Sequence, residues 1–138
     1  MDSLYTKALL RLASDAHGAG RLKQADARID AASPICGDRI HLEIGVQGAK
    51  IIALAHETRA CVLTQASMSM LAEISKGMDT AELIRAEAMI ASWFADGPEP
   101  QSPFEGFRVF ADLKQHPSRQ ACVLLPFKAA IKALQSII

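Results

Sequence analysis

Hydrophobic and polar residues alternate most clearly over residues 40–47, which is the pattern of a half-buried strand. Gly48 can supply a turn after this strand, and residues 50–56 can return antiparallel to it. A third strand is expected over residues 56–60. The pattern therefore predicts a small antiparallel sheet, and the positions that would share the buried face of its first strand are Ile40, Leu42, Ile44 and Val46.

Apolar residues recur at helical spacing on both sides of this predicted sheet. A helix from Leu4 is expected to end at the glycine-containing residues 17–20, and a helix over residues 62–76 is expected to end with Gly77 as its C-cap. Residues 21–35 mix charged residues with alanine and contain a proline near their end, so they are expected to form a loop.

Two more helices are predicted in the second half of the chain. Asp79 is a suitable N-cap with Glu82 three residues later, so a helix is expected over residues 79–94. Residues 98–118 hold four of the six prolines and three phenylalanines, which indicates a packed loop with a short helix. The pattern is helical again from Arg119 to the end of the chain.

Pro126 complicates this last helix. It cannot donate a hydrogen bond to the carbonyl of Cys122 four residues earlier, and its ring crowds the same group, so a kink or a late helix start is expected. Either outcome would leave Cys122 near a helix N-terminus. The helix dipole and free amide groups there favour a thiolate over a thiol.

Composition narrows the class of protein. The chain has 138 residues, half of them apolar, and is expected to form a single domain over residues 1–138. Its 15 basic and 15 acidic residues cancel, so nucleic acids and anionic membranes are not expected as partners. The start lacks the basic segment of a signal peptide, and no apolar run approaches the roughly 20 residues that span a bilayer. We therefore expect a soluble, cytoplasmic protein.

The three cysteines, Cys36, Cys61 and Cys122, need separate explanations. They cannot all pair within one chain, and cytoplasmic thiols remain reduced, so a disulfide framework is not expected. Each cysteine could be a small buried hydrophobic residue without further function. All three nevertheless lie at junctions between predicted elements rather than within apolar periods, and such junctions are where binding sites are built.

Residues 33–38, with the sequence Ser-Pro-Ile-Cys-Gly-Asp, form the sharpest local motif. The glycine allows a tight turn, so the Cys36 thiolate and the Asp38 carboxylate can point at one ion from a loop. An ordinary turn before a strand is the alternative. Three thiolates and one carboxylate would supply the four donors of a tetrahedral zinc site, and thiolates also bind iron–sulfur clusters. Arg39 or, preferably, Arg119 would offset the excess negative charge.

These motifs resemble the U-type scaffold proteins of iron–sulfur cluster assembly, the family of IscU, the NifU N-terminal domain and SufU. Residues 33–38 are similar to that family's Asn-Pro-x-Cys-Gly-Asp motif apart from the first residue. Cys61 with residues 66–70 resembles its second cysteine block, and Cys122 with Leu125 resembles its third. The resemblance implies an α+β, SufE/NifU-like fold in which a three-stranded antiparallel sheet is covered by helices. It also implies four ligands that converge at one exposed end of the molecule: Cys36, Asp38, Cys61 and Cys122.

Within the family the chain is most similar to the SufU type. Ala121 precedes Cys122 where IscU-type members usually carry histidine, and their Leu-Pro-Pro-Val-Lys chaperone motif does not occur. The long stretch between Cys61 and Cys122 is similar to the SufU insertion, and His116 could reach the site from it. Residues 58–60, Thr-Arg-Ala, stand where the family tends to have glycines, which predicts a less mobile loop before Cys61.

The resemblance implies a scaffold that accepts sulfur from a SufS-type cysteine desulfurase, holds a labile iron–sulfur cluster or zinc, and serves apo iron–sulfur acceptor proteins. Asp38 and two thiolates would hold the ion, while Cys61 or Cys122 leaves it to carry the persulfide. A zinc-dependent sulfurtransferase that activates the desulfurase is one alternative. A zinc-stabilised binding module without sulfur chemistry and a family member whose cysteines only fill the core are the others.

The remaining candidate chemistry is sparse. The four histidines show no paired ligand spacing, so none is assigned to the metal. No phosphate loop, nucleophile elbow or dinucleotide fingerprint supports a kinase or hydrolase.

Overall fold

The computed structural model describes residues 6–33 and 37–137. It has an α+β architecture, as predicted. Among the described residues, no helix combines the length and apolar character needed to cross a membrane. In chain order the elements are α1 (Lys7–Asp15), β1 (Ala27–Ala32), β2 (Arg39–Gln47), β3 (Lys50–Arg59), α2 (Val62–Ile74), α3 (Thr80–Phe94), the 3-10 helix η2 (Glu105–Gln115) and α4 (Pro117–Gln135).

The sheet is antiparallel with the strand order β1-β2-β3. The predicted hairpin between β2 and β3 is confirmed, and its turn consists of Gly48 and Ala49, both with positive φ (59° and 64°). The prediction of a third strand over residues 56–60 was wrong, because β3 continues without interruption to Arg59. The third strand is β1, within the stretch expected to be a loop. Its alanines and charged residues hide the alternation, and pairing with β2 supplies the backbone hydrogen bonds that hold it.

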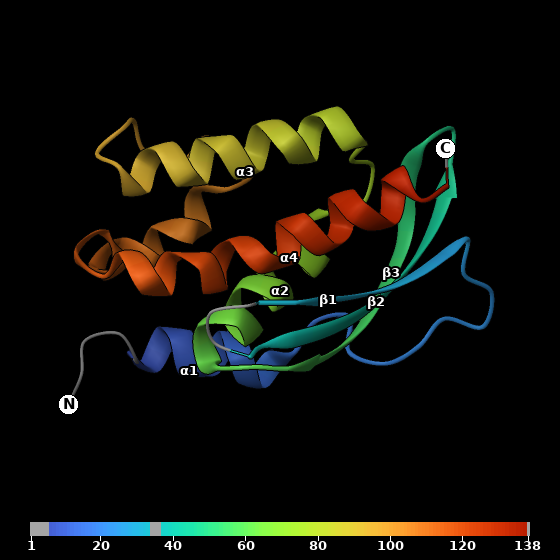
Figure 1. Ribbon diagram of the computed structural model, residues 1–138, viewed down its shortest axis with the longest axis horizontal. Coiled ribbons are helices and arrows are strands. Elements are labelled where there is room, and N and C mark those ends of the chain that lie inside the picture. The colour runs from blue at the N-terminus through green and yellow to red at the C-terminus, as the bar shows by residue number, and fades with distance from the viewer. Residues whose placement is uncertain (1–5, 34–36, 138) are drawn as a thin grey trace.

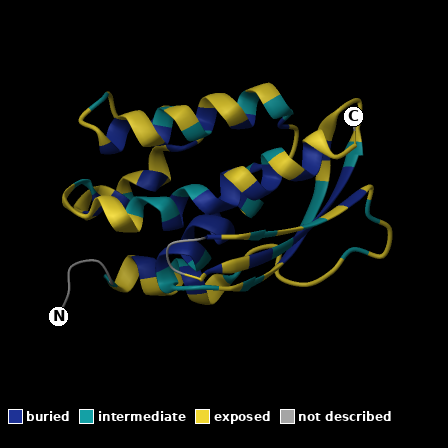
Figure 2. Cartoon of the chain, in the orientation of Figure 1, coloured by how far each residue is buried: buried dark blue, intermediate teal, exposed yellow. Residues whose placement is uncertain are grey.

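Helices cover one face of this sheet (Figure 1). α4 packs on β1 and β2, and α2 packs on β3 and on α4. α3 lies on the far side of α4 from the sheet, and α1 packs against α2. The buried residues follow the facing sides of these layers (Figure 2). This arrangement brings the N-terminal end of α2 and the first half of α4 to the end of the sheet where β2 begins and β3 ends.

The core contains the predicted apolar face of β2, since Ile40, Leu42 and Ile44 are all buried. The predicted packed segment after α3 is also confirmed, and it takes the form of η2. Its phenylalanines pack with one another and with a phenylalanine of α4 at ring-centroid distances of 5.4 to 6.0 Å. The four rings are Phe104, Phe107, Phe110 and Phe127.

The helix ends agree with the sequence in part. The capping box of α3 is confirmed, with the Asp79 carboxylate accepting from the Glu82 amide at 2.8 Å. Gly77 is not the cap of α2, because this helix ends at Ile74 with Ser75 as its C-cap. α1 ends at Asp15, before the expected glycines.

Pro126 was expected to cause a kink or a late helix start, and the late start is ruled out because α4 begins at Pro117. Proline suits the first helical position, because the amide it lacks would have no partner there. Pro126 lies inside the helix. Cys122 is therefore the sixth residue of α4, beyond the first turn to which the free amides and the dipole effect are confined. The helix-terminal environment predicted for Cys122 belongs instead to Cys61.

Candidate metal and sulfur site

Asp38 stands directly before β2, at the end of the connection from β1. The Ser33 amide donates to the Asp38 carbonyl at 2.9 Å, and the Gly37 amide donates to the Ser33 carbonyl at 3.2 Å. Gly37 has a φ of +72°, a left-handed backbone that glycine adopts without strain. These bonds hold the Asp38 side chain, which is only 5% exposed, beneath the end of the sheet. Cys36, the predicted ligand in this connection, lies outside the described residues.

Cys61 is the N-cap of α2, and Ala60 alone separates it from the end of β3. Its backbone amide donates to Asp38 Oδ1 at 3.1 Å, and its Sγ lies 3.3 Å from Asp38 Oδ2. Its side chain is half-buried. The sheet-to-helix junction predicted for this cysteine is confirmed, and it places the thiol beside the Asp38 carboxylate.

Cys122 is completely buried in α4. One donor atom from each of Asp38, Cys61 and Cys122 lies within 4.8 Å of the others. Donor atoms that share one tetrahedral zinc ion lie about 3.5 to 3.8 Å apart, given zinc–ligand distances of roughly 2.0 to 2.3 Å. The three groups could therefore hold a single ion after small side-chain adjustments. The predicted convergence is found for every predicted ligand among the described residues.

Thr64 links these three groups, and the sequence interpretation missed it. Its hydroxyl oxygen lies 2.5 Å from Asp38 Oδ2, 3.6 Å from Cys61 Sγ and 3.0 Å from the Cys122 carbonyl oxygen. Pro126 leaves that carbonyl without its helical donor, so it can accept from a side chain. The spacing Cys-x-x-Thr was the available signal, since the residue three positions after an N-cap lies next to it on the first turn.

The surroundings of Cys61 favour its thiolate. Together they lower the pKa of Cys61 from 9.0 to about 6, and the hydrogen bond from the Cys122 thiol is the largest cause. Burial and the negative charge of Asp38 oppose this shift, whereas the backbone amide and the hydroxyl of Thr64 add to it. At neutral pH the Cys61 sulfur is thus largely a thiolate beside a carboxylate. Two like charges in a half-buried site favour a bound cation.

The other residues considered for the site lie at different distances along the chain from the two thiols. Arg119 is an exposed residue one turn before Cys122 in α4, and its proposed role at the site stays a prediction. Arg39 lines a cavity on the opposite face of the sheet. His116 is exposed at the junction of η2 and α4 and is not part of the group formed by the carboxylate and the two thiols. Thr58 and Arg59 complete β3, and only Ala60 separates this strand from Cys61.

Comparison with known proteins agrees with this arrangement. The family model of the NifU-like N terminal domain matches residues 4–104. The iron-sulfur cluster assembly scaffold protein IscU of Thermotoga maritima is 27% identical over 138 residues, covering 97% of this chain and 94% of the relative. The zinc-dependent sulfurtransferase SufU of Bacillus subtilis is 26% identical over 136 residues, covering 97% and 91%.

Solved structures show the same fold. The N-terminal NifU-like protein of Brucella abortus superposes with a TM-score of 0.90 at 28% identity, covering 99% of this chain and 95% of the other. FiSufU of Fervidobacterium islandicum AW-1 superposes with a TM-score of 0.85 at 23% identity, covering 95% and 96%, and shows the likeness of fold alone. Because the family model matches most of the length of this chain, the chain belongs to the NifU-like N-terminal domain family.

Proposed function

We propose that this chain is an iron–sulfur cluster assembly scaffold that accepts sulfur from a cysteine desulfurase. The observation that carries the proposal is the convergence of a carboxylate and two thiols, one of which has a strongly lowered pKa. Family membership and the likeness to the Thermotoga maritima scaffold support it. Residues 1–138 would act as one domain, with the site formed by Cys36, Asp38, Cys61 and Cys122.

These same four residues would hold zinc or the cluster. The donor set fits zinc, because thiolates with one carboxylate are ordinary zinc ligands and the described donor atoms are close enough to share one ion. Zinc, when bound, would neutralise the crowded negative charge and keep the thiolates deprotonated. The iron–sulfur cluster is the cargo of the protein, built on these side chains and then passed to an apo acceptor protein.

Cys61 is the better candidate for the sulfur acceptor. It is half-buried and has a lowered pKa, whereas Cys122 is completely buried. The Cys61 thiolate would attack the outer sulfur of the donor's persulfide, so that the S–S bond of the donor breaks and the donor cysteine leaves as a thiolate. Cys61 then carries the new persulfide, with no net oxidation or reduction. Asp38 and Cys122 would remain in place to hold the ion.

A zinc-dependent sulfurtransferase is the second candidate, favoured by the likeness to the Bacillus subtilis SufU. In that role the persulfide on Cys61 would pass to another protein without a cluster being built. The donor in either role would be a SufS-type cysteine desulfurase. Both roles need reduced thiols, so we place the protein in the cytoplasm.

The first experiment tests the site. Metal content would be measured in anaerobically purified protein and in variants of each ligand, with the exposed Asp112→Ala as a control. We expect about one zinc ion or cluster per chain in the wild type and in the control. Each ligand variant should lose this metal, because a tetrahedral site needs all four donors. The variants are Cys36→Ser, Asp38→Ala, Cys61→Ser and Cys122→Ser. Metal retained in all four would contradict the proposed site.

The second experiment separates the two roles. The protein would be mixed with a purified SufS-type desulfurase, L-cysteine and iron under anaerobic conditions. A chromophore that forms and then moves to an apo acceptor supports the scaffold. Persulfide on Cys61 that is found by mass spectrometry without a chromophore supports the sulfurtransferase.

A further inference from the structure

A cavity of about 420 Å³ lies on the face of the sheet opposite the helices. It spans the ends of all three strands, at the same end of the sheet as the thiol site. Three arginines and two carboxylates are among its lining residues, so its chemistry is that of ion pairing. These are Arg21, Arg39, Arg59, Asp30 and Glu57.

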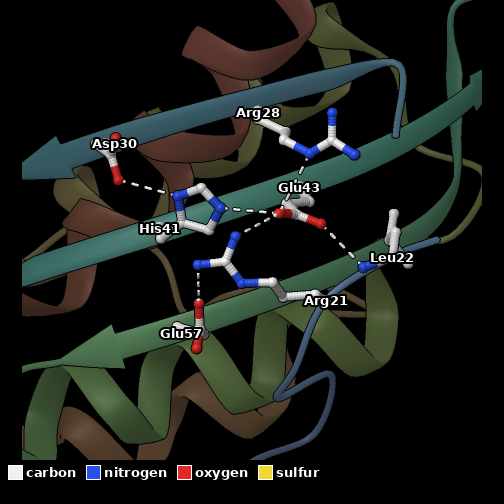
Figure 3. Close-up of polar contacts among 7 residues, drawn as sticks. All are labelled: Arg21, Leu22, Arg28, Asp30, His41, Glu43 and Glu57. Carbon is white, nitrogen blue, oxygen red and sulfur yellow. Dashed lines mark hydrogen bonds and ion pairs between the residues drawn. The ribbon is translucent and has the colours of Figure 1, made fainter. Parts of the chain in front are cut away.

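Glu43 of β2, which is only 1% exposed, holds the residues beside the cavity in place. Figure 3 shows its polar contacts. Glu43 accepts from the Leu22 amide at 2.9 Å and lies 2.9 Å from His41 Nε2. Arg28 Nε lies at 3.4 Å and Arg21 Nη1 at 3.5 Å from the same carboxylate. The segment that carries Arg21 is thereby held across the sheet.

The remaining charges around Glu43 are paired with one another. Arg21 Nη2 lies 2.7 Å from Glu57 Oε1, and His41 Nδ1 lies 3.0 Å from Asp30 Oδ1. Both carboxylates of the cavity and one of its three arginines therefore already have ionic partners. A ligand would have to be recognised by the other two arginines.

Arg39 and Arg59 are these two residues. They are direct partners in the register of β2 and β3, and both are exposed. Within residues 6–33 and 37–137, neither guanidinium has an ion pair or side-chain hydrogen bond. Like charges directly opposite each other on a sheet destabilise the pairing, and an anion between them relieves this repulsion. Guanidinium groups also match carboxylates in a two-point geometry.

The position of this arginine pair indicates the size of its ligand. Asp38 comes directly before Arg39, and Cys61 follows Arg59 by two residues, yet the two sites open on different faces of the sheet. Successive side chains of a strand point to opposite faces, which explains why Asp38 and Arg39 diverge. Cys61 lies beyond the end of β3, where the chain has turned into α2 on the helix side. A small molecule in the cavity would not touch the thiols. A protein that wraps around the end of the sheet could contact both sites.

We propose that Arg39 and Arg59 form the docking site for an acidic segment of the protein that delivers sulfur to Cys61. This inference rests on the proposed function. The chain has no net charge, so such recognition depends on local complementarity rather than on its overall field. Acidic side chains would pair with the two guanidinium groups and bring the partner to the end of the sheet where Cys61 is half-buried.

The first test compares persulfide transfer from a purified SufS-type desulfurase to the wild type and to Arg39→Glu/Arg59→Glu. We expect KM for this protein to rise by about tenfold or more, with kcat within about twofold and zinc content unchanged. The advantage of the wild type should shrink at high salt. Arg85→Glu, which changes an exposed arginine of α3, is the matched control and should leave KM unchanged. An unchanged KM in the double variant, or an equal rise in the control, would overturn the proposal.

The second test needs no sulfur transfer and thus separates this proposal from the proposed function. A capped oligoglutamate peptide would be titrated into the labelled protein, and amide signals would be followed by NMR. Shifts centred on Arg39 and Arg59 that disappear in the double variant support the docking site even if the desulfurase transfers nothing. Shifts spread over other surfaces, or none, overturn it. Equal binding of free glutamate would also overturn it, because the cavity would then recognise a small carboxylate.

Discussion

Two buried carboxylates, those of Glu43 and Asp38, belong to the same stretch of chain but lie in different surroundings. Glu43, on the outer face of β2, is surrounded by two arginines, a histidine and a backbone amide. Asp38, on the helix side, accepts from the Cys61 amide and also lies beside the Cys61 thiol and the Thr64 hydroxyl. The protein compensates the first charge within its own structure, and this contributes to stability. The second site gathers negative charge, which suits a cation supplied from outside.

The largest effect is expected from Thr64→Val, which keeps the shape of a side chain in contact with Asp38 and removes its hydroxyl. Loss of a group that orients metal ligands typically weakens metal binding by about 10- to 100-fold, and we expect that decrease in zinc affinity. Competition with a chromophoric chelator would measure it. Thr64→Ser should restore binding to near the wild-type value. Equal weakening in both variants would indicate that only packing had changed.

The next effect concerns the reactivity of Cys61. In metal-free protein its alkylation by iodoacetamide, followed by mass spectrometry of the Cys61 peptide, should be half-maximal at a pH of about 6. Cys122→Ala removes the largest cause of the lowered pKa, so the midpoint should move toward 9.0 and the rate at neutral pH should fall by about tenfold. A midpoint unaffected by this substitution would contradict the proposed hydrogen bond between the thiols.

On the outer face, Glu43→Gln should lower the melting temperature without changing zinc affinity. The amide has nearly the same shape but leaves two arginines without their shared carboxylate. We expect a decrease of roughly 5 °C, measured on metal-free protein by circular dichroism. Glu57→Gln, at an exposed partner of Arg21, should have a much smaller effect. If Glu43→Gln weakened zinc binding instead, the two regions would not be independent.

The smallest effect is a pH dependence of stability at His41. Its pKa is raised, first by the hydrogen bond to Glu43 and then by that to Asp30, so its contribution is complete below 6.5 and is lost as the pH rises through the raised value. The pKa of Glu43 is lowered, first by His41 and then by the Leu22 amide, so its contribution is complete above 4.5 and is lost on acidification. The melting temperature of wild type minus that of His41→Asn should therefore be greatest between pH 4.5 and 6.5. A flat difference across this range and at alkaline pH would contradict the pairing.

The sequence predicted those helices and strands whose local residue pattern favours the same conformation that they adopt in the folded protein. The hairpin of β2 and β3 and the capping box of α3 belong to this group, since alternation and capping residues are local signals. β1 escaped prediction because alanine and charge give it little pattern, and its strand conformation depends on pairing with β2.

The site shows the same division. The junction positions and the family resemblance indicated Asp38, Cys61 and Cys122, and the structure brings them together. The role of Thr64 depends on the Cys122 carbonyl, which is 58 residues further along the chain. Pro126 leaves this carbonyl without its helical donor, and no local pattern reveals the contact. The charge network around Glu43 likewise depends on a segment without periodicity that crosses the sheet.

The single residue between β3 and Cys61 ties this proposed sulfur acceptor to the end of the sheet. Ala60 is the whole connection between Arg59, which is paired with Arg39, and Cys61 at the start of the helix. With so short a connection, the Cys61 sulfur can move outward only if its side chain rotates or if the terminal pair of β2 and β3, Arg39 and Arg59, separates. The distance that the Cys61 sulfur can move is thus limited by the stability of the pairing between the end of β3 and β2.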